Sequence, residues 1–316
     1  MKIKILLGIF ILLSFIPACQ TADSTGEKNA ADAPKNENAK TETAENKNQP
    51  VAASDKKQEF TGELKFPFEF PAVDTSAKEG EKVLVPSYNW LVDAVQKDPK
   101  TVTMIWYAQE MAEPGAEKSK VKYMRETKEV PNAYIIPLGK GEKAKKGDIL
   151  LTWWQTGSGL QRAIVTDDAN PAEPVVRYLD LDYDNPAKSR DGQTTIGQMD
   201  EKIKPDTFKV IKAELEPGTA VACGDGLEHG QVVRVAGDKI FIMKFAGKID
   251  VKPKSECKAV PLRPNVKAGD RVKAVWVGSF KDGTVTKADN AIGRVWVKFD
   301  QGGTEKVISF GDVYKQ

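Results

Sequence analysis

Histidine is almost absent from this sequence of 316 residues, since His229 is the only one. A metal site built from several histidines is therefore excluded, and zinc held by Cys223, Cys257 and His229 would still need a fourth ligand. A cysteine nucleophile with His229 as its base is a formal alternative. Both of these cysteines fall on predicted strands, however, and we expect no catalytic residue, no metal and no cofactor.

Net charge and long apolar runs are also missing. The 47 lysines and arginines nearly cancel the 45 aspartates and glutamates, and two of the lysines lie in a segment that we expect to be removed. A nearly neutral mature chain argues against a protein that binds the nucleic-acid backbone. Beyond the N-terminus no apolar run is long enough to cross a membrane.

The N-terminus has the pattern of an export signal. Two lysines precede a short apolar run, Ile5–Ile16, which is typical of the hydrophobic region of a secretory signal. The following Ile16-Pro17-Ala18-Cys19 resembles the bacterial lipobox, which implies a lipoprotein signal peptide over residues 1–18 and a diacylated Cys19 that anchors the chain in the membrane. The alternative is an ordinary cleaved signal with an unmodified cysteine. Gln20, where an aspartate would retain the protein at the inner membrane, favours the outer membrane.

Residues 19–59 contain almost no large apolar side chain. Such a composition cannot bury enough surface to offset the entropy lost on ordering, so the sequence predicts a disordered tether after the lipidated cysteine.

The rest of the chain repeats one short pattern, in which a glycine stands three residues before an aliphatic residue that begins a strand. The four heads are Gly80, Gly147, Gly218 and Gly269. Short alternating apolar runs cut by turn residues follow each head, which indicates small β-modules. We therefore predict an all-β chain of modules at 60–140, 141–213, 214–264 and 265–316.

The first module is the most irregular of the four. We expect Leu91-Val92 to lie on a strand there, and residues 110–128, which Pro114-Gly115 interrupts, to form a loop or a short helix. The second module carries an acidic insertion at residues 180–197.

The fourth module resembles the Tudor and agenet group of SH3-like barrels. The resemblance rests on three stretches in order, Gly269–Trp276, Gly283-Thr284-Val285 and Val297–Gly302, and the second module shares it less closely. It implies five-stranded, strongly bent barrels that have no catalytic machinery of their own.

Aromatic residues at the open ends of such barrels can hold a cation or a peptide. The candidate ligand-binding residues are Trp154, Tyr178, Tyr183 and Asn185 in the second module and Trp276 in the fourth, with Asp182 as a polar partner. The alternatives are that the tryptophans pack in the core or between modules, or that they form a methyl-ammonium cage.

Two further sets of residues have competing interpretations. Asp180, Asp182, Asp184 and Asp191 begin like a calcium loop, but the expected glycine at position 6 is missing, so a solvated acidic loop is the better interpretation. Cys223 and Cys257 favour a disulfide in an exported protein, and two buried thiols are the alternative.

Together these patterns predict a non-catalytic, membrane-anchored envelope lipoprotein whose barrels bind a protein or a glycan. A peptidoglycan-binding protein is the first alternative, and an envelope hydrolase or metal-dependent enzyme is the second.

Overall fold

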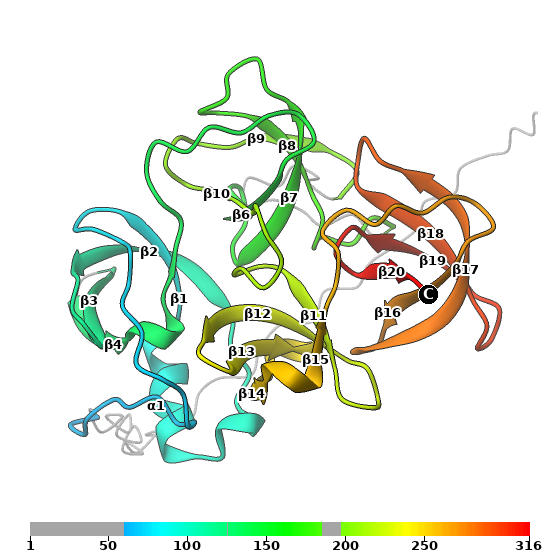
Figure 1. Ribbon diagram of the computed structural model, residues 1–316. Coiled ribbons are helices and arrows are strands. Elements are labelled where there is room, and N and C mark those ends of the chain that lie inside the picture. Colours follow the sequence, from blue (N-terminus) through cyan, green and yellow to red (C-terminus); the bar gives the residue numbers. More distant parts are fainter. Residues whose placement is uncertain (1–59, 125, 185–196) are drawn as a thin grey trace, which may run out of the picture. The chain divides into compact units, whose positions relative to one another are not determined.

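The computed structural model describes residues 60–124, 126–184 and 197–316, within a unit that spans Gln58–Gln316 (Figure 1). The predicted signal peptide, Cys19 and the tether lie outside the described residues. The all-β prediction is confirmed, since antiparallel strands dominate every module. Among the described residues no helix is both long enough and apolar enough to cross a membrane.

The described part of the chain contains the following elements. The first module has β1 (Lys82–Pro86), α1 (Tyr88–Gln96), η1 (Pro99–Thr101), β2 (Trp106–Glu113), β3 (Lys118–Tyr123), β4 (Glu126–Pro131), η2 (Asn132–Tyr134) and β5 (Ile136–Pro137). The second has β6 (Ile149–Trp153), β7 (Leu160–Asp167), β8 (Val175–Tyr178), β9 (Asp200–Lys202) and β10 (Lys209–Val210). The third has β11 (Ala220–Cys223), β12 (Glu228–Ala236), β13 (Lys239–Lys244), η3 (Phe245–Gly247), β14 (Ile249–Pro253), η4 (Lys254–Glu256) and β15 (Cys257–Ala259). The fourth has β16 (Arg271–Trp276), β17 (Ser279–Asp289), β18 (Arg294–Phe299), β19 (Glu305–Ser309) and β20 (Val313–Lys315).

All four modules have the same strand order. The first four strands form an antiparallel meander, and the fifth returns to pair with the free edge of the first: β4-β3-β2-β1-β5 in the first module and β9-β8-β7-β6-β10 in the second. The third and fourth modules repeat this order as β14-β13-β12-β11-β15 and β19-β18-β17-β16-β20.

The four glycine heads have one backbone geometry. Gly80, Gly147, Gly218 and Gly269 have φ between 80° and 91°, in the left-handed region that favours glycine. Each is the third residue of a turn that a backbone hydrogen bond closes, such as Asp270 N–H to the Lys267 carbonyl at 3.0 Å. The repeated head is therefore a β-turn whose third position requires a positive φ.

Each head is joined to a bulge in the second strand of its module. In the fourth module Gly269 N–H donates to the Val285 carbonyl at 2.8 Å, and Val285 N–H donates to the Asp270 carbonyl at 2.9 Å. The pairing register of β17 shifts immediately after Val285. The same two bonds join the glycine head to the second strand in the other three modules, at Met111, Val165 and Val232 in turn. The pairing register shifts after each of these residues. A bulge bends its strand, so this repeated junction bends every sheet at the same place.

The sheets are not closed barrels. Each fifth strand has only two or three residues and pairs with the first strand alone, and in the described residues no fourth strand pairs with a fifth. The strongly bent barrels that the Tudor and agenet resemblance implies are therefore open in this structure.

Two predictions for the first module are wrong. Leu91 lies in α1, where Leu91 and Ala94 are buried on one helical face three residues apart. The described part of residues 110–128 contains the end of β2, all of β3 and the start of β4, in place of a loop or a short helix. In β3 the buried residues Ser119 and Val121 alternate with exposed lysines, which is the pattern of a strand with one buried face.

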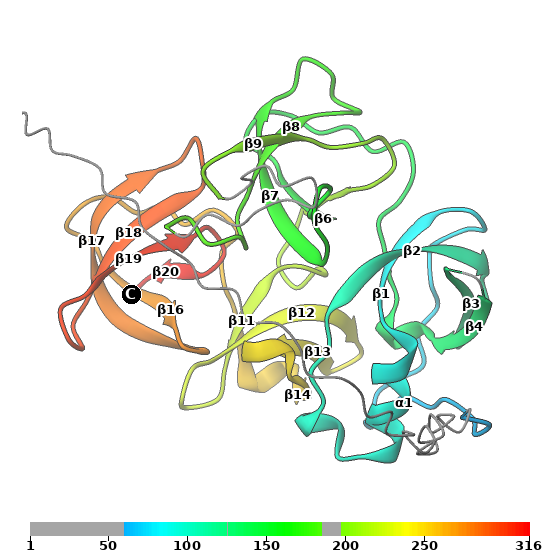
Figure 2. The same cartoon turned by 180° about the vertical axis from the view of Figure 1, so that it is seen from behind.

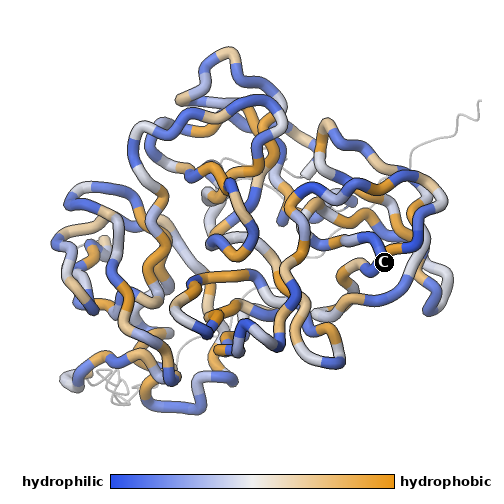
Figure 3. Tube along the Cα trace, viewed as in Figure 1, coloured by the Kyte–Doolittle hydropathy of each residue, from blue (hydrophilic) through white to orange (hydrophobic). Residues whose placement is uncertain are grey.

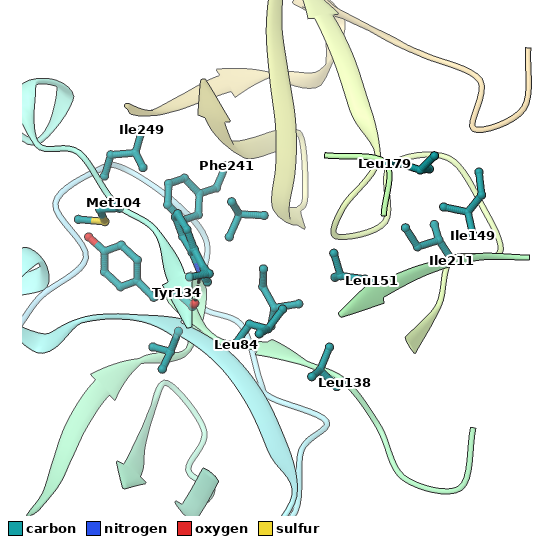
Figure 4. Close-up of a cluster of buried hydrophobic side chains, with 14 of the residues drawn as sticks. Leu84, Met104, Tyr134, Leu138, Ile149, Leu151, Leu179, Ile211, Phe241 and Ile249 are labelled. Carbon is teal, nitrogen blue, oxygen red and sulfur yellow. Dashed lines mark hydrogen bonds between the residues drawn. The ribbon is translucent and has the colours of Figure 1, made fainter. Parts of the chain in front are cut away.

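Buried side chains from all four modules form one large cluster. In Figure 4, Leu84, Tyr134, Phe241, Leu151 and Ile211 belong to this cluster. Along the tube of Figure 3, short hydrophobic stretches on the strands alternate with hydrophilic loops. Separate smaller clusters fill the second module and the third.

The third and fourth modules also share a sheet, because β12 pairs with β17 at Glu228 and Ser279. Two flanking bonds extend this contact, from His229 N–H to the Gly278 carbonyl and from Phe280 N–H to the Leu227 carbonyl, both at 2.9 Å. Figure 2 shows the strands of these modules from behind.

Candidate functional site: a groove between the second and fourth modules

A groove of about 830 Å³ lies between the segment after β8 and the strands β16, β18 and β19. Its apolar walls come from Leu179, Leu181, Tyr183, Val275, Trp276 and Phe299. Its charged groups are Asp180, Asp182, Asp184, Arg294, Lys306 and Asp312. The site therefore combines an aromatic wall with an excess of carboxylates.

Two aromatic pairs border the groove. Trp276 ends β16, is half-buried and packs edge-on against Phe299, with ring centroids 4.6 Å apart. Tyr183, which also lines the groove, packs edge-on against Trp296 of β18, with ring centroids 5.7 Å apart. Val277, the residue after Trp276, is 69% exposed. Large rings that are held in place but not covered are the usual anchors of protein contacts.

Arg294 holds the two walls together. Its buried guanidinium donates to the carbonyls of Tyr178 at 2.6 Å and Leu179 at 2.9 Å, and to Ser309 Oγ. The guanidinium carbon lies 5.4 Å from the centre of the Tyr183 ring. Burial lowers the pKa of Arg294 to about 10, which leaves the side chain charged at neutral pH. A strand of the fourth module thus fixes the loop of the second.

A second buried arginine lies beside the groove. Arg162 on β7 donates to Asp180 at 2.6 Å and to Asp312 at 2.7 Å. It therefore pairs with one carboxylate of the second module and one of the fourth. Asp312 Oδ1 also lies 3.2 Å from His229 Nε2 of the third module. Burial alone would raise the pKa of Asp312, but the charge of Arg162 and the His229 contact outweigh it and hold the pKa well below its usual range. The network therefore links three modules through polar and charged side chains.

The structure brings together only some of the predicted site residues. Tyr183 and Trp276, which the sequence placed in two separate barrel mouths, line the same groove, and Asp182 lies with them. Asn185 lies outside the described residues.

Tyr178 and Trp154 do not lie in the groove. Tyr178 is fully buried, and its hydroxyl contacts Glu201 and accepts from Gln155 N–H at 3.0 Å. Burial, followed by the Glu201 contact, raises the pKa of Tyr178. Trp154 is half-buried against the core of the second module, and its ring lies over Gly157. The assignment of Tyr178 as a ligand contact was wrong, because its side chain is a core residue of the second module.

Sequence reasoning missed Arg294, Phe299 and Asp312. Arg294 directly precedes the apolar run Val295-Trp296-Val297 at the start of β18, and a charged residue next to such a run was the one local signal. Nothing in the sequence indicated that Asp312 would meet residues of two other modules.

Cys223 and Cys257 form a disulfide in the third module, with Cα atoms 4.1 Å apart. They are direct partners in the β11–β15 ladder. Disulfide-bonded sulfurs carry no thiolate, so in this form neither cysteine offers the nucleophile considered above.

The acidic segment does not resemble a calcium loop where it is described. Asp180 is paired with Arg162 and is not available as a free ligand, and Asp191 lies outside the described residues. Over residues 60–124, 126–184 and 197–316, no group of three or more histidine, cysteine or acidic side chains is arranged to hold a metal.

Comparisons with known proteins do not identify the chain. No family model matches it, and no curated protein matches it. Among solved structures, the crystal structure of Arabidopsis thaliana AGDP1 AGD34 is similar over 43% of this chain and 82% of that chain, with 16% sequence identity and a TM-score of 0.21. A similarity of this size assigns neither a family nor a function.

Proposed function

We propose that this chain is a non-catalytic binding protein of the bacterial cell envelope with Tudor-like modules. In this proposal a diacylated Cys19 anchors the chain, at the outer rather than the inner membrane, and residues 20–59 tether the modules. The groove between the second and fourth modules then binds a protein or a glycan of the envelope.

The observation that carries this proposal is the meeting of Trp276 and Tyr183 in one groove. The two rings come from different modules, and both are half-buried. Binding energy concentrates in such aromatic side chains when they border a concave surface. The Arg294 bonds hold the Tyr183 segment against the fourth module, so the site is assembled before a ligand arrives.

The test compares two tryptophans. Trp276→Ala should weaken retention on an immobilised envelope extract by about 2 kcal/mol or more while the melting temperature changes little. Trp154→Ala is the matched control, because Trp154 is also half-buried but does not line the groove. Its retention should equal that of the unmodified protein. Equal retention of the Trp276→Ala and Trp154→Ala variants would remove the groove as the binding site.

Purified sacculi, used as a second matrix, separate the classes of partner. Retention on sacculi would favour peptidoglycan over an envelope protein. Release of soluble fragments from the sacculi would instead reveal a hydrolase and contradict the non-catalytic proposal.

The anchor is tested separately. Because two acyl chains give stable anchoring where one is marginal, the unmodified protein should partition into the detergent phase and Cys19→Ala should not. A Cys19→Ala variant that stayed in the detergent phase and was processed normally would contradict the lipid anchor.

A further inference from the structure

The wall of the groove formed by β19 is the edge of a strand and not one of its faces. The groove contacts four successive residues, Lys306, Val307, Ile308 and Ser309. Successive side chains of a strand point to opposite faces of the sheet, so a cavity above one face would meet only alternate residues. Contact with four in a row indicates that the groove runs along the backbone of β19.

The ladder between β18 and β19 shows which backbone groups point to this edge. Phe310 N–H donates to the Gly293 carbonyl and Phe299 N–H to the Thr304 carbonyl, at the two ends of the ladder. Hydrogen-bonded and non-hydrogen-bonded pairs alternate in an antiparallel ladder, so the intervening pair of Trp296 and Val307 is non-hydrogen-bonded. The N–H and carbonyl of Val307 therefore point away from β18.

An independent contact supports this orientation. The Trp296 carbonyl accepts from Thr286 Oγ1 of β17 at 3.3 Å, so it faces away from β19. Among the described residues, β19 pairs with β18 alone, and no other described group bonds to the backbone of Val307. An edge with unpaired donors and acceptors is a template for a further strand.

We propose, building on the function proposed above, that the groove binds an extended peptide segment of a partner protein, which adds as a strand to the outer edge of β19. The segment alternates basic and aliphatic residues. Its backbone pairs with Val307, its aliphatic side chains meet the Trp276 wall, and its basic side chains face the aspartates among residues 180–184 that line the groove.

The charged side chains that line the groove favour a peptide with basic residues. Four aspartates line it against two cations, Arg294 and Lys306. Arg162 binds Asp180 and Asp312, and Asp184, which also lines the groove, is exposed. A peptide with basic residues complements that charge, and an acidic peptide does not.

The experiment uses the full chain and the peptide Lys-Val-Lys-Val-Lys-Val-amide, which carries fluorescein on its N-terminus, in a direct titration. The key variant is Val307→Pro, which removes an outward N–H. Proline also fixes φ there, but the edge of a sheet is a place where a strand tolerates proline. Val307→Ala is the matched control, since it shortens the same side chain and keeps the N–H. We expect Val307→Pro to weaken binding about tenfold or more and Val307→Ala to change it little, with melting curves recorded for both.

A second arm does not depend on the folding of any variant. The same peptide with every amide N-methylated keeps its charge but has no backbone N–H to donate, and its methyl groups obstruct close approach to a strand edge, so its binding to the unmodified protein should be lost. An acidic version with glutamate in place of lysine should also fail to bind. Equal binding of the N-methylated peptide, or no saturable binding of the basic peptide up to about 1 mM, would overturn strand addition.

Retention on envelope extract distinguishes failure of this inference from failure of the proposed function. If Trp276→Ala loses retention and a folded Val307→Pro keeps it, the groove remains the site but strand addition is wrong. A glycan partner would give that result, because a polysaccharide has no pairing backbone. If both variants keep retention, the proposed function itself fails.

Discussion

Replacing Arg162 should show how much the buried charge network contributes to the free energy of unfolding. The Arg162 side chain is only 4% exposed and pairs with Asp180 and Asp312, which belong to different modules. Arg162→Met would keep most of the volume but leave two largely buried carboxylates without their cation. Breaking a buried pair in this way costs about 3 to 5 kcal/mol of the free energy of unfolding.

The chain contains a matched control at its surface. Arg271 pairs with Asp300, but their side chains are 46% and 51% exposed. Exposed pairs contribute about 0 to 1 kcal/mol, so Arg271→Met should be nearly silent. Urea unfolding at neutral pH, followed by tryptophan fluorescence, gives both free energies. Equal losses of the free energy of unfolding in the two variants would refute the reasoning. A loss below about 1 kcal/mol for Arg162→Met would refute it as well.

Acid pH provides a second check on the same network. Because the pKa of Asp312 is lowered in the folded protein, its contribution to stability is fully present above the unfolded pKa of about 3.9. That contribution is lost as the pH falls through the folded pKa. Without Arg162, burial raises the pKa of Asp312, and a protonated Asp312 needs no cation. The difference in the free energy of unfolding between the unmodified protein and Arg162→Met should therefore become smaller as the pH falls. At neutral pH, adding Asp312→Asn to Arg162→Met should recover part of the lost free energy of unfolding.

Two further predictions concern the modules themselves. Gly269→Ala should cost about 1 to 2 kcal/mol from its positive φ alone, since nothing lies within 4 Å of the added Cβ, and Gly218→Ala should cost more because that atom would lie 2.7 Å from Leu151 Cδ1. Gly226→Ala, with open space and no positive φ, is the neutral control, and equal melting temperatures for the three variants would contradict the turn geometry. Reducing the Cys223–Cys257 disulfide, which closes a separation of 34 residues, should lower the free energy of unfolding by about 3 to 4 kcal/mol. Identical unfolding curves with and without reductant would show that the bond contributes nothing.

The repeated head could be predicted from sequence because a β-turn is a local structure. Its glycine, the turn and the strand that follows lie within a few residues, so the same spacing recurs at Gly80, Gly147, Gly218 and Gly269. The helix α1 was missed because Leu91-Val92 is too short a run to distinguish a helix from a strand.

The candidate site could be predicted only in part, because it depends on contacts between modules. Tyr178 and Tyr183 lie five residues apart and looked equivalent in a single module. Tyr178 is in fact a core residue, whereas Tyr183 is held over the groove by Arg294, more than 100 positions later in the chain. No local pattern encodes that pairing, since it requires β18 to lie beside the segment after β8.

Contacts between modules also explain how four similar modules can give one binding surface. Each module has one strand order and one bend, so the sheets themselves differ little. The contacts at their edges differ more: β12 of the third module pairs with β17, while β19 of the fourth lines an open groove. Arginines lie at such contacts. The buried Arg162 and Arg294 join the second module to the fourth, and the half-buried Arg234 of the third module donates to the carbonyls of Asn132 and Ile135 in the first. Substitutions at these contacts should therefore change binding more than substitutions at the repeated turns, which mainly set stability.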